Sequence, residues 1–176
     1  HNHQISGTKL VCSCGDALAA NGIVTVGEKK YYLIAGVLQT GWQSVGVEGY
    51  CYADPQTMEV YAGCEFTVAG ITYTANENGL MLGGAWVENY LGRKYSFGPA
   101  FYRKTWATID GVQYYFGSNN YAYTGYHQIR DNENNKKTPY RWFLFGEDGA
   151  LVDDMKDYYG FLDVDGVKYF LEGGIG

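Results

Sequence analysis

A strand–turn–strand pattern repeats along the chain, and residues 106–126 carry its clearest copy. Asp110-Gly111 is a turn pair, because glycine adopts positive φ angles without a steric penalty. Residues 112–116 (VQYYF) alternate between the two faces of a strand, 117–120 (GSNN) form a second turn, and 121–124 (YAYT) have the composition of a short returning strand. A single small hairpin is marginally stable in water, so its aromatic faces require neighbouring hairpins.

A junction pair, a small residue followed in most copies by an aromatic one, begins each copy of this pattern. The second residues of successive pairs are 19 to 22 residues apart over the first six pairs, and 35 residues separate the last two. The chain therefore contains about eight units with a period near 20 residues, which is typical of arrays in which each unit contacts chiefly its neighbours. The junction pairs are Gly22-Ile23, Gly41-Trp42, Gly63-Cys64, Ala85-Trp86, Thr105-Trp106, Gly125-Tyr126 and Gly160-Phe161.

This periodicity predicts an all-β fold of stacked β-hairpin repeats, with residues 1–176 as a single repeat-array module. The composition agrees, because 17% aromatic residues and 25 glycines indicate short strands and many turns, whereas disordered chains are poor in aromatic residues. The long interval holds residues 127–138 (HQIRDNENNKKT), a polar insertion predicted to be a surface loop. The last unit lacks a following junction, so we expect the module to belong to a longer protein.

Charge and hydropathy exclude two classes of partner. The net charge is −6, and no basic run is longer than a lysine pair, so we expect no nucleic-acid partner. No apolar run approaches the roughly 20 residues that span a bilayer, so we expect no membrane insertion.

Catalytic and metal-binding patterns are weak. The carboxylate pairs Asp153/Asp154 and Asp163/Asp165 fall in predicted turns rather than across a cleft, as a glycosidase would need. His127 has no serine or cysteine near it in sequence. Calcium loops need several oxygen ligands and a closing glutamate, and residues 131–135 (DNENN) and 163–166 (DVDG) lack the full set. We expect no enzyme activity, metal or cofactor within this segment, although a catalytic domain can lie outside it.

The four cysteines, Cys12, Cys14, Cys51 and Cys64, allow three pairings if all are oxidised. A ring between Cys12 and Cys14 would be short and strained, so Cys51 with Cys64 is the easier pair. Their spacing differs from the usual zinc-binding CxxC pairs. We favour the interpretation that they are small buried hydrophobic residues.

These units resemble the cell-wall-binding or choline-binding repeats of secreted bacterial proteins, a superfamily that includes the glucan-binding repeats of glucosyltransferases and the repeats of large clostridial toxins. The shared pattern is a Gly-Trp junction, an aromatic cluster of the Trp/x-Tyr-Tyr-Phe kind and a glycine turn. Residues 106–126 and 22–42 match it best, and weaker matches cover nearly the whole chain. The resemblance implies a β-solenoid of hairpins rotating about an axis, ligand sites in the grooves between hairpins, and a secreted or cell-surface location.

Choline-type repeats usually carry a tryptophan just before the Tyr-Tyr pair, which helps to build an aromatic cage for a quaternary ammonium group. In this chain, Tyr50 and Trp142 are the aromatic residues that could occupy this position. A lysine there would repel choline. The glucan-binding and toxin branches, with Lys-Tyr-Tyr-Phe or similar clusters, are the closer match. The other residues at this position are Lys30, Thr72, Lys94 and Gln113.

We predict a non-catalytic carbohydrate- or cell-wall-glycan-binding module, with a polysaccharide as partner. An exposed aromatic face stacks on the C–H face of a sugar, while Gln113, Lys94 and Asn119 are candidates to bind hydroxyl groups. Several weak sites on one array gain avidity on a polymer. The alternatives are a structural spacer or protein-adhesion module with internal aromatics and, within the family, choline or teichoic-acid binding. The candidate ligand-binding residues are Trp42, Tyr50, Trp86, Trp106, Tyr115, Tyr126 and Trp142.

Overall fold

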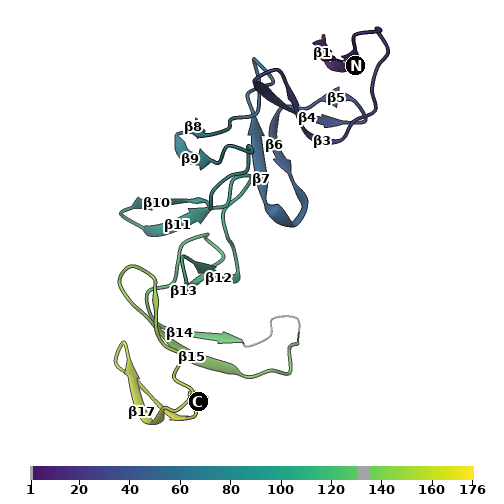
Figure 1. The fold of residues 1–176 in the computed structure, drawn as a ribbon. Coiled ribbons are helices and arrows are strands. Elements are labelled where there is room, and N and C mark those ends of the chain that lie inside the picture. Colours follow the sequence, from purple (N-terminus) through teal and green to yellow (C-terminus); the bar gives the residue numbers. More distant parts are fainter. Residues whose placement is uncertain (1, 131–134) are drawn as a thin grey trace. The chain divides into compact units, whose positions relative to one another are not determined.

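The computed structural model describes residues 2–130 and 135–176, and these residues form β-strands, turns and one short 3-10 helix, η1 (Gly46–Glu48), without an α-helix. This confirms the all-β prediction. In the described residues, eight hairpins follow one another along the chain (Figure 1), and each of the seven predicted junction pairs lies at or next to the start of a hairpin. Two compact units result, and each is described in turn.

The first unit comprises His1–Ala85 and Ser96–Ala100. It contains a five-stranded sheet of order β1-β2-β5-β4-β3 and two further hairpins, β6–β7 and β8–β9. The strands are β1 (His3–Ser6), β2 (Lys9–Cys12), β3 (Gly22–Val26), β4 (Lys29–Ile34), β5 (Val37–Leu38), β6 (Gly41–Ser44), β7 (Tyr50–Ala53), β8 (Cys64–Val68) and β9 (Ile71–Ala75).

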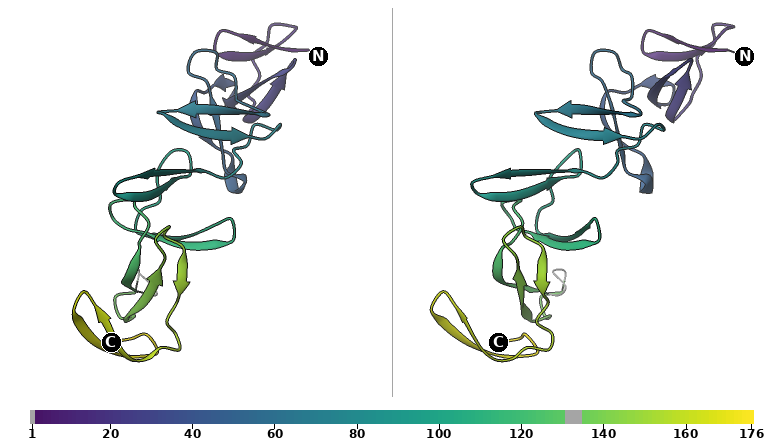
Figure 2. Two further views of the ribbon diagram at one scale, coloured as in Figure 1. Left: turned by 90° about the vertical axis from the view of Figure 1, so that its left-hand side faces the viewer. Right: turned by 60° about the vertical axis from the view of Figure 1, so that its left-hand side comes forward.

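The second unit comprises Trp86–Tyr95 and Phe101–Gly176. Its hairpins are separate small sheets, of which one gains a third strand, as the two views of Figure 2 show. The strands are β10 (Ala85–Asn89), β11 (Gly92–Ser96), β12 (Thr105–Ile109), β13 (Val112–Phe116), β14 (Gly125–Arg130), β15 (Tyr140–Phe145), β16 (Leu151–Asp153), β17 (Tyr159–Val164) and β18 (Val167–Glu172).

The hairpin β12–β13 has the local chemistry that its sequence predicts. Asp110 and Gly111 have φ angles of 51° and 79°, and positive φ at both central residues is the mark of a type I′ turn, whose twist suits a two-residue hairpin. The turn sets the register, which places Trp106 opposite Tyr115. The predicted returning strand at 121–124 is wrong. These residues make isolated bridges, because their backbone hydrogen bonds go to two different hairpins rather than along one partner strand.

In the second unit, the hairpins β12–β13 and β14–β15 each pack through one face on the hairpin before and through the other on the hairpin after. Tyr114 and Phe116 of β13 share a buried cluster with Trp86 and Tyr95 of β10–β11. The opposite face of the same strand carries Tyr115, which packs with β14–β15. This two-sided packing follows from the period of two along a strand, and it explains why aromatic residues occupy consecutive positions of the strand.

The predicted surface loop at 127–138 is partly wrong. Residues 127–130 continue strand β14, because Ile129 alternates inward and is 2% exposed, so the strand has a buried anchor that a loop would lack. Residues 131–134 lie outside the described residues. Residues 135–138 form a turn, in which the Thr138 N–H donates to the Asn135 carbonyl oxygen at 3.0 Å.

The cysteines differ from the prediction. Cys12 and Cys14 form a disulfide, with their Cα atoms 5.2 Å apart, because the chain leaves strand β2 in a turn that brings both sulfur atoms to one side. Cys51 and Cys64 are free thiols, and Cys64 is exposed. Cys51 fits the prediction of a small buried residue, and its burial raises the pKa of its thiol to about 11.

Candidate ligand-binding site

The three junction tryptophans occupy equivalent places at the start of β6, β10 and β12. Each is half-buried and meets a tyrosine of its own hairpin edge-on. The ring centroids are 5.0 Å apart for Trp42 with Tyr52, 5.1 Å for Trp86 with Tyr95 and 5.3 Å for Trp106 with Tyr115. Aromatic residues of the next hairpin complete each contact; Phe143, for instance, lies 5.0 Å from Trp106.

What covers the indole ring differs among the three. The guanidinium of Arg93 lies 3.9 Å from the ring centroid of Trp86 and occupies that face by a cation–π contact. Gly98 lies so close to Trp42 that a Cβ added there would be 2.9 Å from the ring. Trp106 instead lines an open groove. A sugar-stacking face is therefore available at Trp106 and taken at the other two.

The Trp106 groove has a volume of about 190 Å³. Drug-sized pockets begin at roughly 300 Å³, so this groove suits one sugar unit of a polymer better than a whole oligosaccharide. Its apolar side is formed by Trp106, Phe143 and Leu151, and its polar rim by Gln113, Arg141, Asp154 and Lys156.

The polar rim is ordered by contacts within the second unit. Arg141 Nη1 donates to the backbone oxygen of Asp154 at 2.6 Å, and its guanidinium lies 4.4 Å from the ring centroid of Phe143. Lys156 Nζ is 3.7 Å from Asp154 Oδ2, a long pair between exposed side chains that contributes little stability. Gln113 is exposed on β13. The rim thus offers donors from Arg141 and Lys156, an acceptor from Asp154 and both from Gln113.

Gln113 explains why this groove is open. It precedes Tyr115 by two residues, as Arg93 precedes Tyr95, so both lie on the strand face that carries the junction tryptophan. The longer, charged Arg93 covers Trp86, whereas Gln113 leaves Trp106 accessible from the groove.

The structure places the other predicted site residues in packing contacts. Tyr50 is half-buried, 6.1 Å from Phe97, and Tyr126 is half-buried against the cluster that contains Trp142. Tyr115 and Trp142 are 4% and 5% exposed, so these two rings support the hairpin contacts from inside. Their roles as ligand residues stay predictions.

Two polar residues proposed beside the sugar lie elsewhere. Lys94 Nζ lies 4.3 Å from the ring centroid of Phe101, and the side-chain oxygen of Asn119 accepts the backbone N–H of Tyr121 at 3.1 Å. Gln113 is thus the predicted hydroxyl partner that the structure brings to Trp106.

Sequence reasoning missed a set of tyrosines in the linkers between hairpins. Tyr61 lies parallel to Phe66 at 5.0 Å, Tyr102 lies 5.4 Å from Phe116, and Tyr123 lies 5.0 Å from Tyr115. Each precedes the next junction residue by three or four positions. This recurrence was the signal that could have identified them.

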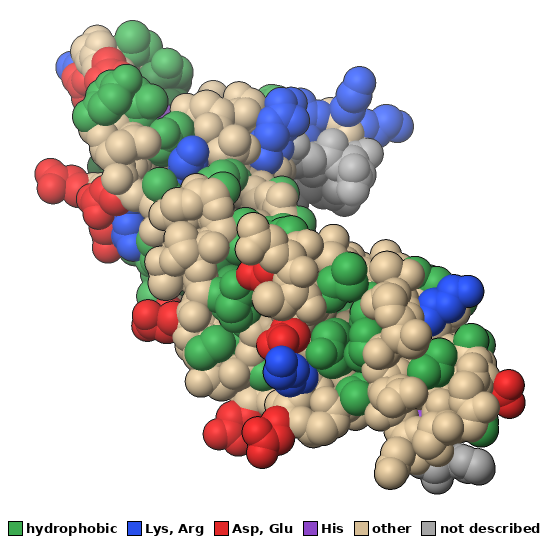
Figure 3. Space-filling model, turned by 90° about the horizontal axis from the view of Figure 1, so that it is seen from above, with side chains coloured by type: hydrophobic (Ala, Val, Ile, Leu, Met, Phe, Trp, Pro, Cys, Tyr) green, Lys and Arg blue, Asp and Glu red, His purple; other side chains and the backbone are tan. Residues whose placement is uncertain are grey.

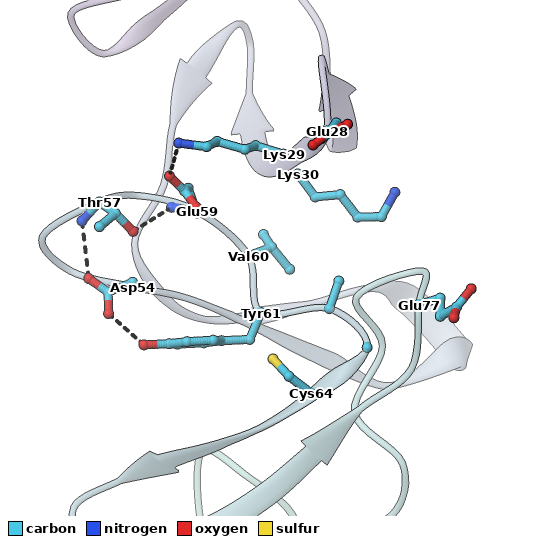
Figure 4. A pocket seen from close by; sticks show the side chains of 12 residues that line it. Glu28, Lys29, Lys30, Asp54, Thr57, Glu59, Val60, Tyr61, Cys64 and Glu77 are labelled. Carbon is cyan, nitrogen blue, oxygen red and sulfur yellow. Dashed lines mark hydrogen bonds and ion pairs between the residues drawn. The ribbon is translucent and has the colours of Figure 1, made fainter.

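A larger groove, of about 640 Å³, lies in the first unit beside Tyr61 (Figure 4). Three of its charged groups have partners within the groove. Lys29 pairs with Glu59 at 2.9 Å, and the Tyr61 hydroxyl donates to Asp54 at 2.6 Å. That hydrogen bond lowers the pKa of Asp54 and raises the pKa of Tyr61 to about 12. With these groups occupied and no junction tryptophan in its lining, this groove suits a sugar less well than the Trp106 groove.

The carboxylates and His127 have structural partners. Asp153, Asp154 and Asp163 each accept a backbone N–H of a turn at 2.8–3.1 Å. The ring of His127 stacks on Tyr123 at 3.9 Å, and burial lowers its pKa. These contacts place the four side chains in turns and packing contacts.

Within the described parts of the chain, one group of three potential metal ligands lies close together, formed by Cys12, Cys14 and Asp16. The disulfide between the two cysteines removes both thiolates, so this arrangement does not suit a metal ion. No helix of the described residues is long and apolar enough to cross a membrane.

No protein-family model matches the chain, and no curated protein sequence matches it. Solved structures similar to it include CbpJ from Streptococcus pneumoniae TIGR4, at 18% identity over 89% of this chain and 52% of that chain (TM-score 0.36). Choline binding protein F from Streptococcus pneumoniae matches at 18% identity over 89% and 52% (TM-score 0.35). Truncated alternansucrase from Leuconostoc mesenteroides NRRL B-1355 matches at 16% identity over 81% and 11% (TM-score 0.41). The chain spans about half the length of the first two.

Proposed function

We propose that the chain is a non-catalytic carbohydrate- or cell-wall-glycan-binding module of a secreted or cell-surface protein, with its hairpins arranged as a β-solenoid. The observation that carries this proposal is the open groove at Trp106. The ring of Trp106 lines this groove, while Arg93 lies against Trp86 and Gly98 lies against Trp42.

The groove has the chemistry of a sugar site. The C–H face of a pyranose packs on the ring of Trp106. Sugar hydroxyls both donate and accept hydrogen bonds, and the rim matches them with Gln113, Arg141 and Asp154. Such a small site binds one sugar weakly, so useful retention arises from several contacts along one polymer.

Choline binding is the alternative within the family. A quaternary ammonium group needs an aromatic cage without a competing cation. The rim of the Trp106 groove carries two cations, Arg141 and Lys156, against one carboxylate, Asp154. This balance favours a glycan over choline. A spacer or protein-adhesion module, with its aromatics used for packing alone, is the alternative from another class.

The test is a binding screen on soluble and insoluble glucans, peptidoglycan and choline resin, with the wild type and a matched pair of variants. Trp106→Ala and Trp86→Ala remove equivalent half-buried rings from the same unit, so both cost stability. We expect Trp106→Ala to weaken glycan binding by about tenfold or more, which is about 1.4 kcal/mol, and Trp86→Ala to leave it within about twofold. Circular dichroism checks folding, and Trp106→Phe replaces Trp106→Ala if the latter unfolds.

The outcomes separate the candidate functions. Equal loss in both variants would show that the tryptophans act through stability alone. Retention on choline resin in preference to every glycan would replace the proposal with choline binding. Binding of the folded wild type to none of these materials would favour the spacer or adhesion module.

A further inference from the structure

A second groove, of about 260 Å³, lies between the same two hairpins, β12–β13 and β14–β15, and its lining differs entirely from that of the Trp106 groove. Both grooves border the buried cluster of Tyr115, Ile129, Phe143 and Phe145. The polar and aromatic residues that matter in this Arg130 groove are Lys104, Ser118, Tyr123, Gln128, Arg130 and Tyr140.

Arg130 is held in place at this groove with part of its hydrogen-bonding capacity unused. Its guanidinium lies 4.5 Å from the ring centroid of Tyr140, directly across the β14–β15 ladder. Its Nη1 atom is shielded from solvent and has no hydrogen-bond partner among the described residues. A buried donor without an acceptor is costly, and a guanidinium cannot lose its charge to escape that cost. The site therefore favours a ligand that brings an acceptor.

The charge of the groove is positive. Lys104 and Arg130 line it, and no described carboxylate does; Asp131 and Glu133 lie outside the described residues. The ion pairs between described residues involve Lys29 and Lys156. In a chain with a net charge of −6, such a concentration of positive charge stands out.

Further cations lie on the same two hairpins and the chain next to them. Arg103 Nε donates to the backbone oxygen of Ser118 at 2.9 Å, which holds the turn that supplies the Ser118 side of the groove. Lys136 and Lys137 are exposed on the turn between β14 and β15. Figure 3 shows lysine and arginine side chains gathered on one part of the face in view.

We propose that the Arg130 groove binds the anionic group of an acidic glycan, a carboxylate or phosphate on a sugar. This inference rests on the proposed glycan-binding function and names a ligand class for a second site within it. The planar fork of Arg130 matches two oxygens of such a group, and Lys104 adds a point charge. Ser118 and Gln128 meet the hydroxyls of the sugar.

The test measures the affinity of the full chain by calorimetry for two pairs of probes, each differing by the anionic group. Trigalacturonic acid is compared with galactotriose, and glucose 6-phosphate with glucose. We expect at least one acidic probe to bind about tenfold or more tightly than its neutral counterpart. Raising the salt concentration should weaken that preference, because charge attraction is screened. The acidic probe that binds shows whether the groove prefers a carboxylate or a phosphate on the sugar.

Variants locate the site. Arg130→Gln should remove the preference for the acidic probe, and Arg130→Lys, which keeps the charge without the fork, should retain part of it. The matched control is Lys137→Gln, which removes the same charge from the same hairpin outside the groove and should change affinity by less than about twofold. If Arg130→Gln fails to fold, Lys104→Gln is the second variant and should weaken the acidic probe by about threefold.

The inference is overturned if acidic and neutral probes bind equally, or if Lys137→Gln costs as much affinity as Arg130→Gln, since diffuse attraction would then suffice. In both cases binding of neutral glycans that depends on Trp106 would leave the proposed function standing. If the folded chain binds neither the probes nor any glucan or peptidoglycan, the inference and the proposed function fail together.

Discussion

One side chain on the second strand of the hairpin distinguishes Trp86, which is covered by a guanidinium, from Trp106, which lines a groove. Arg93 and Gln113 lie two residues before the tyrosine that meets the tryptophan edge-on. Arg93 lies 3.9 Å from the Trp86 ring, whereas Gln113 and Trp106 line a groove together. Two hairpins of the same construction thus differ in what lies against the junction tryptophan.

The substitution Gln113→Arg tests this difference by copying the covered hairpin. We expect the new guanidinium to lie over Trp106 and to weaken glycan binding by about tenfold, while the cation–π contact adds about 0.5 kcal/mol of stability. Calorimetry measures the affinity, and thermal unfolding measures the stability. Gln4→Arg, which adds the same charge at an exposed position of β1, is the control and should leave both unchanged. Unaltered glycan binding by Gln113→Arg would show that Trp106 is not the contact surface.

Part of the site was predictable from the sequence, namely the junction tryptophan and Gln113 beside it. The strand period places Gln113 and Tyr115 on one face, but which hairpin covers that face depends on tertiary packing. The same period puts Lys94 on the strand face opposite Tyr95, away from Trp86. Lys94 is therefore not beside the junction tryptophan, where the sequence analysis expected it to bind a sugar hydroxyl. Arg130 was missed because a polar run containing an arginine resembles a loop, and its strand depends on the single buried anchor Ile129.

At the scale of elements, the hairpins and their tight turns were predictable, and the linkers between them were not. Turn chemistry such as Asp110-Gly111 is local, so it appears directly in the sequence. Residues 121–124 have strand composition, but their hydrogen bonds go to separate hairpins, which no local pattern reveals. The Cys12–Cys14 disulfide likewise depends on the turn at the end of β2, which the spacing of the two cysteines does not reveal.

The linker after β11 fixes Trp42 from outside, and Gly98 makes this possible. Its φ is 113°, and a Cβ at this position would be 2.9 Å from the indole. We therefore expect Gly98→Ala to lower the free energy of unfolding by about 1–3 kcal/mol, from overpacking and backbone strain together. Denaturant unfolding followed by tryptophan fluorescence is the measurement.

Gly70→Ala is the matched control, because Gly70 also has a positive φ, 80°, but nothing lies within 4 Å of its added Cβ. Gly70→Ala isolates the part of the loss that comes from backbone strain, and we expect it to lower the free energy of unfolding by about 1 kcal/mol. If Gly98→Ala and Gly70→Ala lower the free energy of unfolding equally, the loop 96–100 moves to make room for the methyl group. Gly98 would then not be held closely against Trp42.

At the scale of the whole molecule, the chain divides into two compact units, and the hairpin β8–β9 ends the apolar stacking of the first. Its inner face carries Phe66 and Tyr73, which pack with Trp42. Its other face is polar, with Thr67 and Thr72 hydrogen-bonded at 2.9 Å through their hydroxyls, and it is exposed. The sequence contained a sign of this, since Cys64 replaces the junction tryptophan there. Uniform repeats would predict one continuous array, whereas the chain forms two compact units.

This interruption predicts that the two units unfold separately. Phe116 is fully buried in the second unit, and Phe116→Ala should cost about 3–5 kcal/mol of that unit's stability. Cys51 is buried in the first unit, so its reaction with a thiol reagent reports opening of that unit. We expect Phe116→Ala to leave the labelling rate of Cys51 unchanged. Leu33→Ala, which empties a buried site in the first unit, should raise that rate by at least about tenfold.

The exposed thiol of Cys64 serves as an internal control, because it should react at a similar rate in every variant while the protein is folded. Substituting Cys64→Ser then leaves Cys51 as the single free thiol for the rate measurement. Equal acceleration of Cys51 labelling by Phe116→Ala and Leu33→Ala would mean that the chain unfolds as one cooperative array. In that case the polar face of β8–β9 is no boundary, and the single-module prediction from the repeat period holds for stability as well.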